Sequence, residues 1–414
     1  MKTLIQKPVC YEEALSKILA EAKNFKSEIE TVPLQNAVNH ILAEDIVADT
    51  DYPAIANSSM DGFCVHSSDI ADASHENPIT LPTVSGIDAG SFLDELPQGK
   101  CAYIATGAPV PPGADAVVRL EEVDADFNSS HAVFRKAVKA GNFIRPQGSE
   151  LKAGQIICRK SKLIDPFIVG IAASAGLSAL KVFRKPRIAV LTSGDELVMP
   201  WDIAQPWQTR NANTAMLVAQ VHEAGGEAID MGIARDANDH ARNLFFRAVD
   251  IADIVVTSGG ISKGRKDPFR NLFEELEIEP VVYGVKIKPG KPLFFGHYKS
   301  KPVFALPGNQ VASAVSFELF VRSYIRHSLN LPPTRQTLNI RLKSESKNSS
   351  GRDFFERGYF VEENGELFVQ PISKQESHML SGFSQTEVLY LHPAEVPVLN
   401  PGESVKCFLL RNQR

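Results

Sequence analysis

The stretch "VVTSGGISKGRKD", residues Val255–Asp267, joins a run typical of a buried strand to a glycine turn and a cluster of charges. Its β-branched residues lead into Ser258-Gly259-Gly260, where glycine can adopt positive φ and lets the backbone approach a ligand. Gly259 and Gly264 have the separation of a P-loop, but Arg265 stands where that motif requires lysine, so we reject a Walker-type ATPase. A glycine pair alone is more often plain strand-to-turn geometry than a ligand site, and its meaning depends on the neighbouring segments.

From Pro186 onward, strand-like and helix-like segments alternate on both sides of this stretch. Units of this length predict a mostly parallel sheet covered by helices on both faces, a three-layer α/β domain. Right-handed crossovers place the carboxyl ends of the strands at one edge, where ligands bind. The expected strands are "RIAVLT", "EAIDMGIA", "DIVVTSGG", "VVYGVKI", "PLFFGHY" and "PVFALPG", and the expected helices are "NTAMLVAQVHEAGG", "DHARNLFFRAVD", "PFRNLFEEL" and a long helix from Gln310 to about Ser328.

The rest of the chain predicts three further domains. Helices are expected over Tyr11–Lys23 and Leu34–Ala43, and helical texture returns at "DPFIVGIAASAG". Short strands separated by Gly and Pro lie between these helical parts, which is the signature of an inserted all-β module. Strands in the last eighty or so residues predict a small β-barrel or sandwich. The domain boundaries we predict are 1–50 plus 151–183 for a helical linker domain, 51–150 for the inserted all-β domain, 184–332 for the α/β domain and 333–414 for the C-terminal β-barrel domain.

Composition narrows the class of protein. The chain has 414 residues, of which 43% are hydrophobic and 22% charged, and it can therefore bury several cores. A net charge of -5, with no basic block longer than "RKSK", argues against a nucleic-acid partner. The N-terminus lacks an apolar leader and no segment approaches the length of a membrane helix, so we expect a cytoplasmic protein without a membrane partner. The five cysteines are scattered and never spaced as CxxC, which signals neither a disulfide framework nor a zinc site.

Three strand ends of the α/β domain carry glycine-rich turns that are expected to meet at one edge of the sheet. Such turns, followed by helix N-termini, favour a phosphate or a similar oxyanion. Asp195 and Glu196, with Asp267 on a neighbouring loop, would suit a hard divalent cation, although Asp195 alone is equally well explained as a helix cap. A phosphate ester with Mg²⁺ needs both features. The residues expected to bind substrate here are Ser193 and Gly194, Ser258, Gly259 and Gly260, and Pro307, Gly308 and Asn309.

The segment "VKIKPGKPLFFG" adds three lysines around a Pro-Gly turn. Lys286 and Lys288 are two residues apart and share one face of a strand, and Lys291 follows the turn. Lysines at a strand end usually serve only as a solvated edge. Beside a glycine-rich and acidic edge, we interpret them as counter-charges for an anionic substrate.

Six segments are notable for their order. They are "NSSMDGFCV", "ATGAPVPPGADAVVRLEE", "TSGDELV", "VVTSGGIS", "VKIKPGKPLFFG" and "ALPGNQVAS". In order and approximate spacing they resemble the molybdopterin molybdenumtransferase (MoeA) family, which includes the E domain of gephyrin. The resemblance extends over essentially the whole chain. Each motif alone would be weak, but six in order are hard to obtain by chance.

The resemblance implies a homodimer of four-domain subunits whose active cleft is shared between the subunits, and an α/β domain like the molybdopterin-binding MogA fold. The implied reaction takes adenylylated molybdopterin and molybdate as substrates, cleaves the phosphoanhydride with Mg²⁺, and releases AMP. The implied partners are a MogA-like adenylyltransferase and a recipient molybdoenzyme. The sequence does not distinguish molybdate from tungstate.

The resemblance also implies roles for single residues. Asp61 of "SMDG" and Thr106 of "TGAPVP" would reach the cleft of the neighbouring subunit. Arg145 would bind substrate, and Glu150 would be a metal ligand at the exit of the inserted module. The implied catalytic residues are Asp61, Glu196, Asp236 and Asp267, with Glu196, Asp267 and Glu150 as metal ligands.

The chain departs from the family pattern in three places. Gly148-Ser149-Glu150 stands where the family commonly has Gly-Glu-Asp, the segment before Asp267 is basic, and Gln310 replaces a proline. These changes motivate an alternative: a paralogue that binds molybdopterin as a scaffold or binding protein without inserting metal. A nucleotide-pyrophosphate hydrolase on the same α/β domain is a third hypothesis, because a fold does not fix its chemistry.

Overall fold

The computed structural model describes residues 7–25, 27–126, 128–235, 238–261 and 267–411. The chain forms two compact units, which we describe separately. One comprises Met1–Glu30, Asn39–Ile41 and Val182–Arg414, and the other comprises Thr31–Val38 and Leu42–Lys181. The first thirty residues thus belong to a different unit from residues 151–181. The four domain boundaries that the sequence suggests stay a prediction.

A six-stranded sheet in the order β17-β14-β18-β22-β21-β19 organises the first unit. The first four strands are parallel, and β21 and β19 are antiparallel to their neighbours. This confirms the mostly parallel sheet. The chain leaves β14 toward β17 and then returns to β18 on the other side of β14, which makes β14/β18 the switch point of the sheet. The strands are β14 (Arg187–Ser193), β17 (Glu227–Ala234), β18 (Ile254–Ser258), β19 (Pro280–Tyr283), β21 (Phe294–Tyr298) and β22 (Lys301–Leu306).

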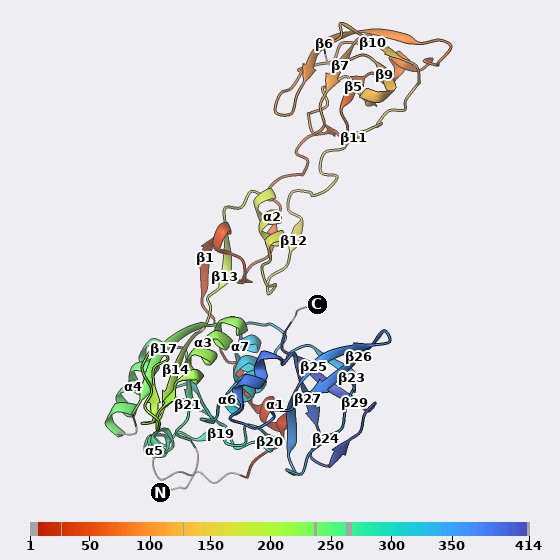
Figure 1. Ribbon diagram of the computed structural model, residues 1–414. Helices are drawn as coiled ribbons and strands as arrows, with labels where there is room; N and C mark the ends of the chain where they lie inside the picture. Colours follow the sequence, from red (N-terminus) through yellow and green to blue (C-terminus); the bar gives the residue numbers. More distant parts are fainter. Residues whose placement is uncertain (1–6, 26, 127, 236–237, 262–266, 412–414) are drawn as a thin grey trace. The chain divides into compact units, whose positions relative to one another are not determined.

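Helices cover both faces of this sheet (Figure 1). Alternate residues of β14 serve opposite faces: Ile188 and Val190 pack in one core, and Ala189 and Leu191 in the other. The first core includes α3 (Ala212–Ala224) and the continuous helix α6 (Gln310–Ser316), η4 (Phe317–Val321) and α7 (Arg322–Ser328). The second includes α4 (Asn238–Ile251) and α5 (Pro268–Glu275).

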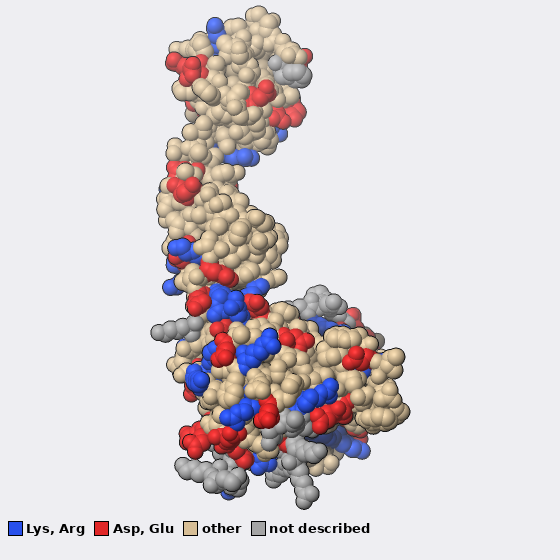
Figure 2. Space-filling view, turned by 90° about the vertical axis from the view of Figure 1, so that its left-hand side faces the viewer, with Lys and Arg blue, Asp and Glu red and all other residues tan. Residues whose placement is uncertain are grey.

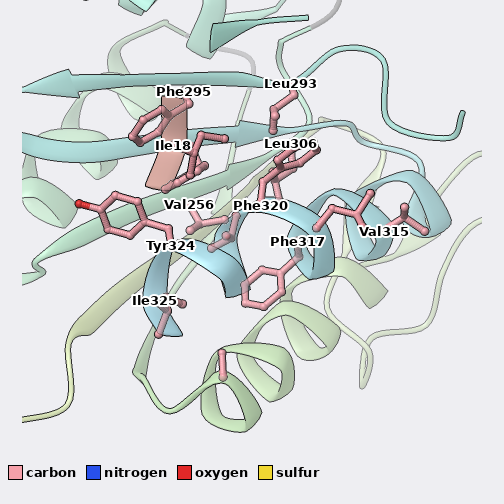
Figure 3. Packing of buried hydrophobic residues seen from close by; sticks show 14 of the residues in the cluster. Ile18, Val256, Leu293, Phe295, Leu306, Val315, Phe317, Phe320, Tyr324 and Ile325 are labelled. Atoms are coloured by element: carbon pink, nitrogen blue, oxygen red, sulfur yellow. The ribbon is translucent and has the colours of Figure 1, made fainter. Parts of the chain in front are cut away.

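The long helix expected from Gln310 to Ser328 is present, with a π-helical turn, η4, in its middle. Its apolar side chains pack on the sheet (Figure 3). Tyr324, for example, lies 5.8 Å from the Phe295 ring and 5.6 Å from the Phe304 ring, centroid to centroid. The N-terminal helix α1 (Tyr11–Ala22) joins the same core through Tyr11, Ala14, Ile18 and Ala22, which recur at intervals of three or four residues along one face.

The helix expected over Leu34–Ala43 is wrong. Only one 3₁₀ turn forms there, η1 (Leu34–Asn36), and the chain then enters strand β2 (Ile41–Leu42). Asn39 between them has φ 65°, a left-handed conformation that a helix cannot contain but that asparagine tolerates in turns.

The C-terminal part of the first unit is a closed β-barrel. Its strands run β25-β26-β23-β29-β27, and β25 also pairs with β27, which closes the ring. Strand β20 (Ile287–Lys288) extends this sheet by pairing in parallel with Asp353 and Phe354 of β25. The barrel strands are β23 (Thr337–Leu342), β25 (Asp353–Glu363), β26 (Glu366–Pro371), β27 (Val388–His392) and β29 (Ser404–Leu409), with the short pair β24 (Ser346–Lys347) and β28 (Val398–Leu399) beside them.

The second unit contains the all-β module that the sequence predicts. Its six-stranded sheet has the order β8-β5-β7-β6-β10-β9, and two apolar clusters pack against it. Helix α2 (Pro166–Ser174) also belongs to this unit, and the Asp165 side chain caps it by accepting a hydrogen bond from the Ile168 N–H at 2.8 Å. The sheet strands are β5 (Gly62–Val65), β6 (Ile79–Ile87), β7 (Cys101–Ile104), β8 (Ala116–Arg119), β9 (Val123–Asp124) and β10 (His131–Phe134).

Two surface observations complete the fold. On the face shown in Figure 2, Lys and Arg lie among Asp and Glu, with no continuous basic stripe among the coloured residues. Within the described part of the chain, none of the helices has both the length and the apolar character that spanning a membrane requires.

Candidate active site

A cavity of about 570 Å³ lies in the first unit, at the carboxyl ends of β14, β18 and β22. The parallel register brings these ends together, because Thr192 pairs with Ser258 and Ser258 with Leu306. The cavity therefore sits at the switch point of the sheet, where ligands of open α/β folds bind. The residues from the three turns that line it are Ser193, Gly194 and Glu196, Ser258, Gly259, Gly260, Ile261 and Asp267, and Pro307, Gly308 and Asn309.

The glycine turn after β18 depends on the absence of side chains. Gly259 and Gly260 have φ of 87° and 69°, in the left-handed region that favours glycine. A Cβ on Gly259 would lie 2.8 Å from the Ser193 carbonyl oxygen, and one on Gly260 would lie 2.7 Å from the Ser193 Oγ. The first and second turns can pack this closely only because both residues are glycine.

A buried hydrogen-bond network fixes the turns relative to one another. The Asn213 side chain, in the first turn of α3, donates through Nδ2 to the Ser258 Oγ at 2.9 Å and to the Gly308 carbonyl at 2.7 Å. The Ser258 Oγ donates in turn to the Pro307 carbonyl at 3.0 Å. One side chain of α3 thus links the turns after β18 and β22.

Asn211 plays a related part at the start of α3. Its Oδ1 accepts a hydrogen bond from the Thr214 N–H at 3.2 Å, and its Nδ2 donates to the Thr192 Oγ1 at 2.8 Å. Sequence reasoning missed both Asn211 and Asn213. For Asn211 the signal was available, since asparagine directly before a helical run is a favoured cap. Further lining residues that it missed are Leu197, Thr209, Arg210, Ala212, Ile261, Pro292 and Gln310.

The acidic side chains behave differently from one another. Glu196 and Asp267 both line the cavity, as expected, and Asp195 does not. The turn that carries Glu196 is held from behind by Arg235, whose Nη1 donates to the Asp195 carbonyl at 3.2 Å and to the Leu197 carbonyl at 3.0 Å. Among the described residues, no group of three or more His, Cys, Asp or Glu side chains is arranged to hold a metal ion.

The three lysines are not among the residues that line the cavity, although Pro292 directly after them is. Lys288 lies on β20, and its Nζ is 4.1 Å from the centroid of the Phe354 ring in the barrel. Lys286 and Lys291 are exposed. The backbone of Lys286 bridges elements, because its N–H donates to the Val9 carbonyl and its carbonyl accepts from the Asp353 N–H.

The remaining candidate residues lie in the second unit or outside the described residues. Asp61 and Thr106 are in contact: the Asp61 Oδ1 accepts hydrogen bonds from the Thr106 N–H at 2.7 Å and from its Oγ1 at 3.0 Å. Arg145 lies on β11 (Ile144–Arg145) and is exposed, as is Glu150. Asp236 falls outside the described residues, as do the cations at 263, 265 and 266.

Comparison with known proteins identifies the family. Consecutive parts of the chain match three family models: the MoeA N-terminal region (domain I and II) over residues 9–176, the probable molybdopterin binding domain over 189–327, and the MoeA C-terminal region (domain IV) over 339–410. A molybdopterin molybdenumtransferase from Haemophilus influenzae is 31% identical over 407 residues, which cover 95% of this chain and 96% of that protein. The chain belongs to the molybdopterin molybdenumtransferase family.

Further members of the family support the same assignment along the whole chain. The molybdopterin molybdenumtransferase of Bacillus subtilis is 29% identical over 98% of this chain and 95% of its own length. Two crystal structures of molybdopterin biosynthesis MoeA proteins from Pyrococcus horikoshii match with TM-scores of 0.84 and 0.80 and identities of 31% and 27%, over 98% and 97% of this chain and 100% of each matched chain. The fold is that of MoeA, with a MogA-like α/β domain and a C-terminal barrel.

Family membership relates the cavity to a known biosynthetic activity and to one of the matched domains. The chain is an enzyme of molybdenum cofactor biosynthesis. All the described residues that line the cavity lie within residues 189–327, the part that matches the probable molybdopterin binding domain.

Proposed function

We propose that this enzyme inserts molybdate into adenylylated molybdopterin and releases AMP, in a reaction that depends on Mg²⁺ and takes place in the cavity at the β14/β18 switch point. The carrying observation is that three glycine-containing turns and two carboxylates, Glu196 and Asp267, line one cavity. Turns of this kind suit phosphate oxygens, and carboxylates suit a divalent cation. A diphosphate-linked substrate needs both.

The phosphates would lie against the turns and the helix starts. Ala212 and Asn213 at the beginning of α3, and Gln310 at the beginning of α6, all line the cavity. The amino ends of helices carry partial positive charge and favour anions. Arg210 adds a full positive charge to the lining. These groups would orient the substrate and offset its charge.

The carboxylates fit Mg²⁺ in its usual substrate-bound mode. Glu196 and Asp267 supply two carboxylates to the cavity, and Mg²⁺ commonly takes one or two carboxylates together with substrate phosphates and water. This mode does not need a cage of three protein ligands. When bound there, the cation would supply Lewis-acid polarisation of the anhydride being cleaved. Glu196 and Asp267 would hold it, with Glu150 as the third proposed ligand.

We further propose a cytoplasmic homodimer in which the second unit of one subunit completes the cleft of the other. Asp61 and Thr106 support this part of the proposal, because they form one hydrogen-bonded pair at an exposed turn. Arg145 would contribute positive charge from the same unit, and Asp236 a further acid. Lys286, Lys288 and Lys291 would contribute positive charge near the cleft. A MogA-like adenylyltransferase would be the partner that supplies the substrate, and a molybdoenzyme the partner that receives the product.

The test is AMP release from adenylylated molybdopterin with molybdate and Mg²⁺. Asp267→Asn should slow release by about a hundred-fold or more, on the scale of losing one electrostatic group at the reacting centre. Asp250→Asn, which changes an exposed carboxylate on α4, is the matched control and should retain the wild-type rate. Binding of molybdopterin without any AMP release by the folded wild-type protein would favour the scaffold alternative instead, and release that is indifferent to Asp267 would remove the proposed metal site.

A further inference from the structure

The loop between β15 (Leu197–Val198) and β16 (Thr209–Arg210) exposes three large apolar side chains. Trp201, Ile203 and Trp207 are 76%, 88% and 74% exposed. Exposure of this degree is costly for side chains as large as tryptophan, and clustered exposed apolar residues mark binding surfaces. The chain contains two tryptophans, and both are in this loop.

Local hydrogen bonds give the loop a defined shape. The Asp202 Oδ2 accepts from the Met199 N–H at 3.1 Å, and the Gln208 Oε1 accepts from the Gln205 N–H at 3.0 Å. Parallel pairing of Leu197 with Thr209 closes the base of the loop. Packing of Trp201 and Trp207 into the protein contributes little to this shape, since both rings are mostly exposed.

The base of the loop is part of the cavity wall. Leu197, Thr209 and Arg210 all line the cavity, so the chain leaves the cavity, presents the two tryptophans, and returns to it. Trp207 is two residues from Thr209, and the loop is therefore anchored at the cavity on both sides.

The cavity itself has no aromatic side chain among the described residues that line it. Its lining is suited to the charged middle of a nucleotide-linked substrate, but the ends of such a substrate are flat nitrogen heterocycles. Stacking on an aromatic side chain is the general way in which proteins hold such rings. The cavity lacks an aromatic side chain for such stacking, and the two exposed tryptophans of the adjoining loop could supply one.

We propose that the loop 199–208 is an aromatic platform at the cavity, on which Trp201 and Trp207 stack a fused-ring nitrogen heterocycle of the ligand. The inference rests on the proposed function for the identity of the ligand and adds the residues that bind its flat end. Adenine and pterin share the chemistry that the platform recognises. The platform positions the ligand by its rings, whereas the glycine turns hold it by its phosphates.

Intrinsic fluorescence tests the proposal directly, because light that excites tryptophan alone reports only on this loop. AMP and a simple pterin are titrated separately into the wild-type protein, with free tryptophan amide as the control for light absorbed by the pterin. Saturable quenching by either probe is the expected result, and the probe that quenches identifies which ring is bound. No quenching by either probe at concentrations that calorimetry shows to saturate the protein would overturn the proposal.

Variants separate stacking from other uses of the surface. Trp201→Ala together with Trp207→Ala should weaken binding of the quenching probe, measured by calorimetry, by about ten-fold. Ile203→Ser should leave that affinity unchanged, since isoleucine cannot stack. Phe92→Ala, which removes a 76% exposed aromatic side chain elsewhere, is the matched control and should also bind normally.

The competing use of the surface is contact with a second copy of the chain. In that case the tryptophan fluorescence would change on dilution without any probe, and Ile203→Ser would weaken self-association as the tryptophan variants do. The affinity for the probe would be the same in the wild type and in all of these variants. That result would overturn the stacking proposal. Failure of AMP release with intact quenching would count against the proposed reaction alone. Normal AMP release without quenching would count against the platform alone.

Discussion

Gly259 has a left-handed backbone, and a Cβ at this position would lie 2.8 Å from the Ser193 carbonyl oxygen. Gly259→Ala should therefore destabilise the protein in two ways, through backbone strain and through a steric clash between two turns. Gly402 isolates the first cost, since its φ is also 87° and a Cβ there would meet nothing within 4 Å.

We predict that Gly402→Ala lowers the free energy of unfolding by about 1–2 kcal/mol through strain alone. Gly259→Ala should lower it by about 1–3 kcal/mol more, because the clash forces the turns apart. Urea unfolding of both variants measures the difference. Equal losses would mean that the turns after β14 and β18 relax freely, and the cavity floor would then be less rigid than the structure shows.

His297 gives the stability of the first unit a pH dependence. Its ring is half-buried on β21, 5.3 Å from the Phe295 ring, and burial lowers its pKa below the usual value, while Glu21 opposes this. The unfolded chain then binds a proton at a higher pH than the folded protein does. The free energy of unfolding should therefore fall as the pH goes from about 7 to about 5.

His297→Gln should reduce this loss, because it removes the group whose protonation favours the unfolded state. The measurement is the urea midpoint at both pH values for the wild type, for His297→Gln and for His131→Gln, which alters an exposed histidine. We expect His131→Gln to follow the wild type. A pH dependence that is the same in His297→Gln and the wild type would assign the effect to other groups.

The glycine turns could be read from the sequence because each depends on a residue type that marks it. Asn213 could not be assigned its role in the same way. Its two acceptors, on Ser258 and Gly308, come from segments 45 and 95 residues away. Only the folded sheet brings them within reach of one amide.

Helices and strands are determined mostly by local side-chain patterns, and most of them could be predicted from the sequence for that reason. Burial on alternate faces of β14 reflects its period of two, and the stripe on α1 reflects the period of a helix. The failures are at sites where one residue changes the backbone. Asn39 ends a run that is otherwise compatible with a helix, and the π turn at Phe317–Val321 adds a residue to a helix without a local signal.

One buried polar group connects three elements of the barrel. The Glu356 Oε1 on β25 is 2.9 Å from the Nδ1 of His392 on β27, and the Ser346 Oγ on β24 donates to the same carboxylate oxygen. The other ring nitrogen of His392 donates to the Val396 carbonyl at 2.8 Å. All three side chains are buried, and removing one partner leaves a buried polar group without its hydrogen bond.

We predict that Glu356→Gln lowers the free energy of unfolding by about 1–3 kcal/mol, because it disturbs hydrogen bonds between buried side chains. Lys347→Ala breaks an exposed pair with Glu345 in the same barrel and should leave the free energy of unfolding nearly unchanged. Guanidinium unfolding of the two variants provides the comparison. A loss below about 1 kcal/mol in Glu356→Gln would mean that the network is not essential to the barrel.

At the scale of the whole molecule, the sequence order of six motifs predicted the family, and comparison over nearly the full chain confirmed it. The α/β cavity was predictable because parallel strands share an edge. A cleft shared between subunits is a proposal of a different kind, since no local sequence pattern encodes contacts between subunits. Asp61 and Asp267 lie in different units of the chain, and this separation allows a direct experiment.

In a shared cleft, Asp61 of one subunit would act with Asp267 of the other. Asp61→Asn and Asp267→Asn should each be nearly inactive alone. After mixing and subunit exchange, random pairing makes about half of the dimers mixed, and each mixed dimer has one cleft in which both aspartates are intact, so about a quarter of wild-type AMP release should return. The same mixture before exchange is the control and should stay inactive. If exchange is demonstrated and activity does not return, the two aspartates act within one chain or not in one site, because only a cleft built from two subunits can be repaired by pairing two different defects.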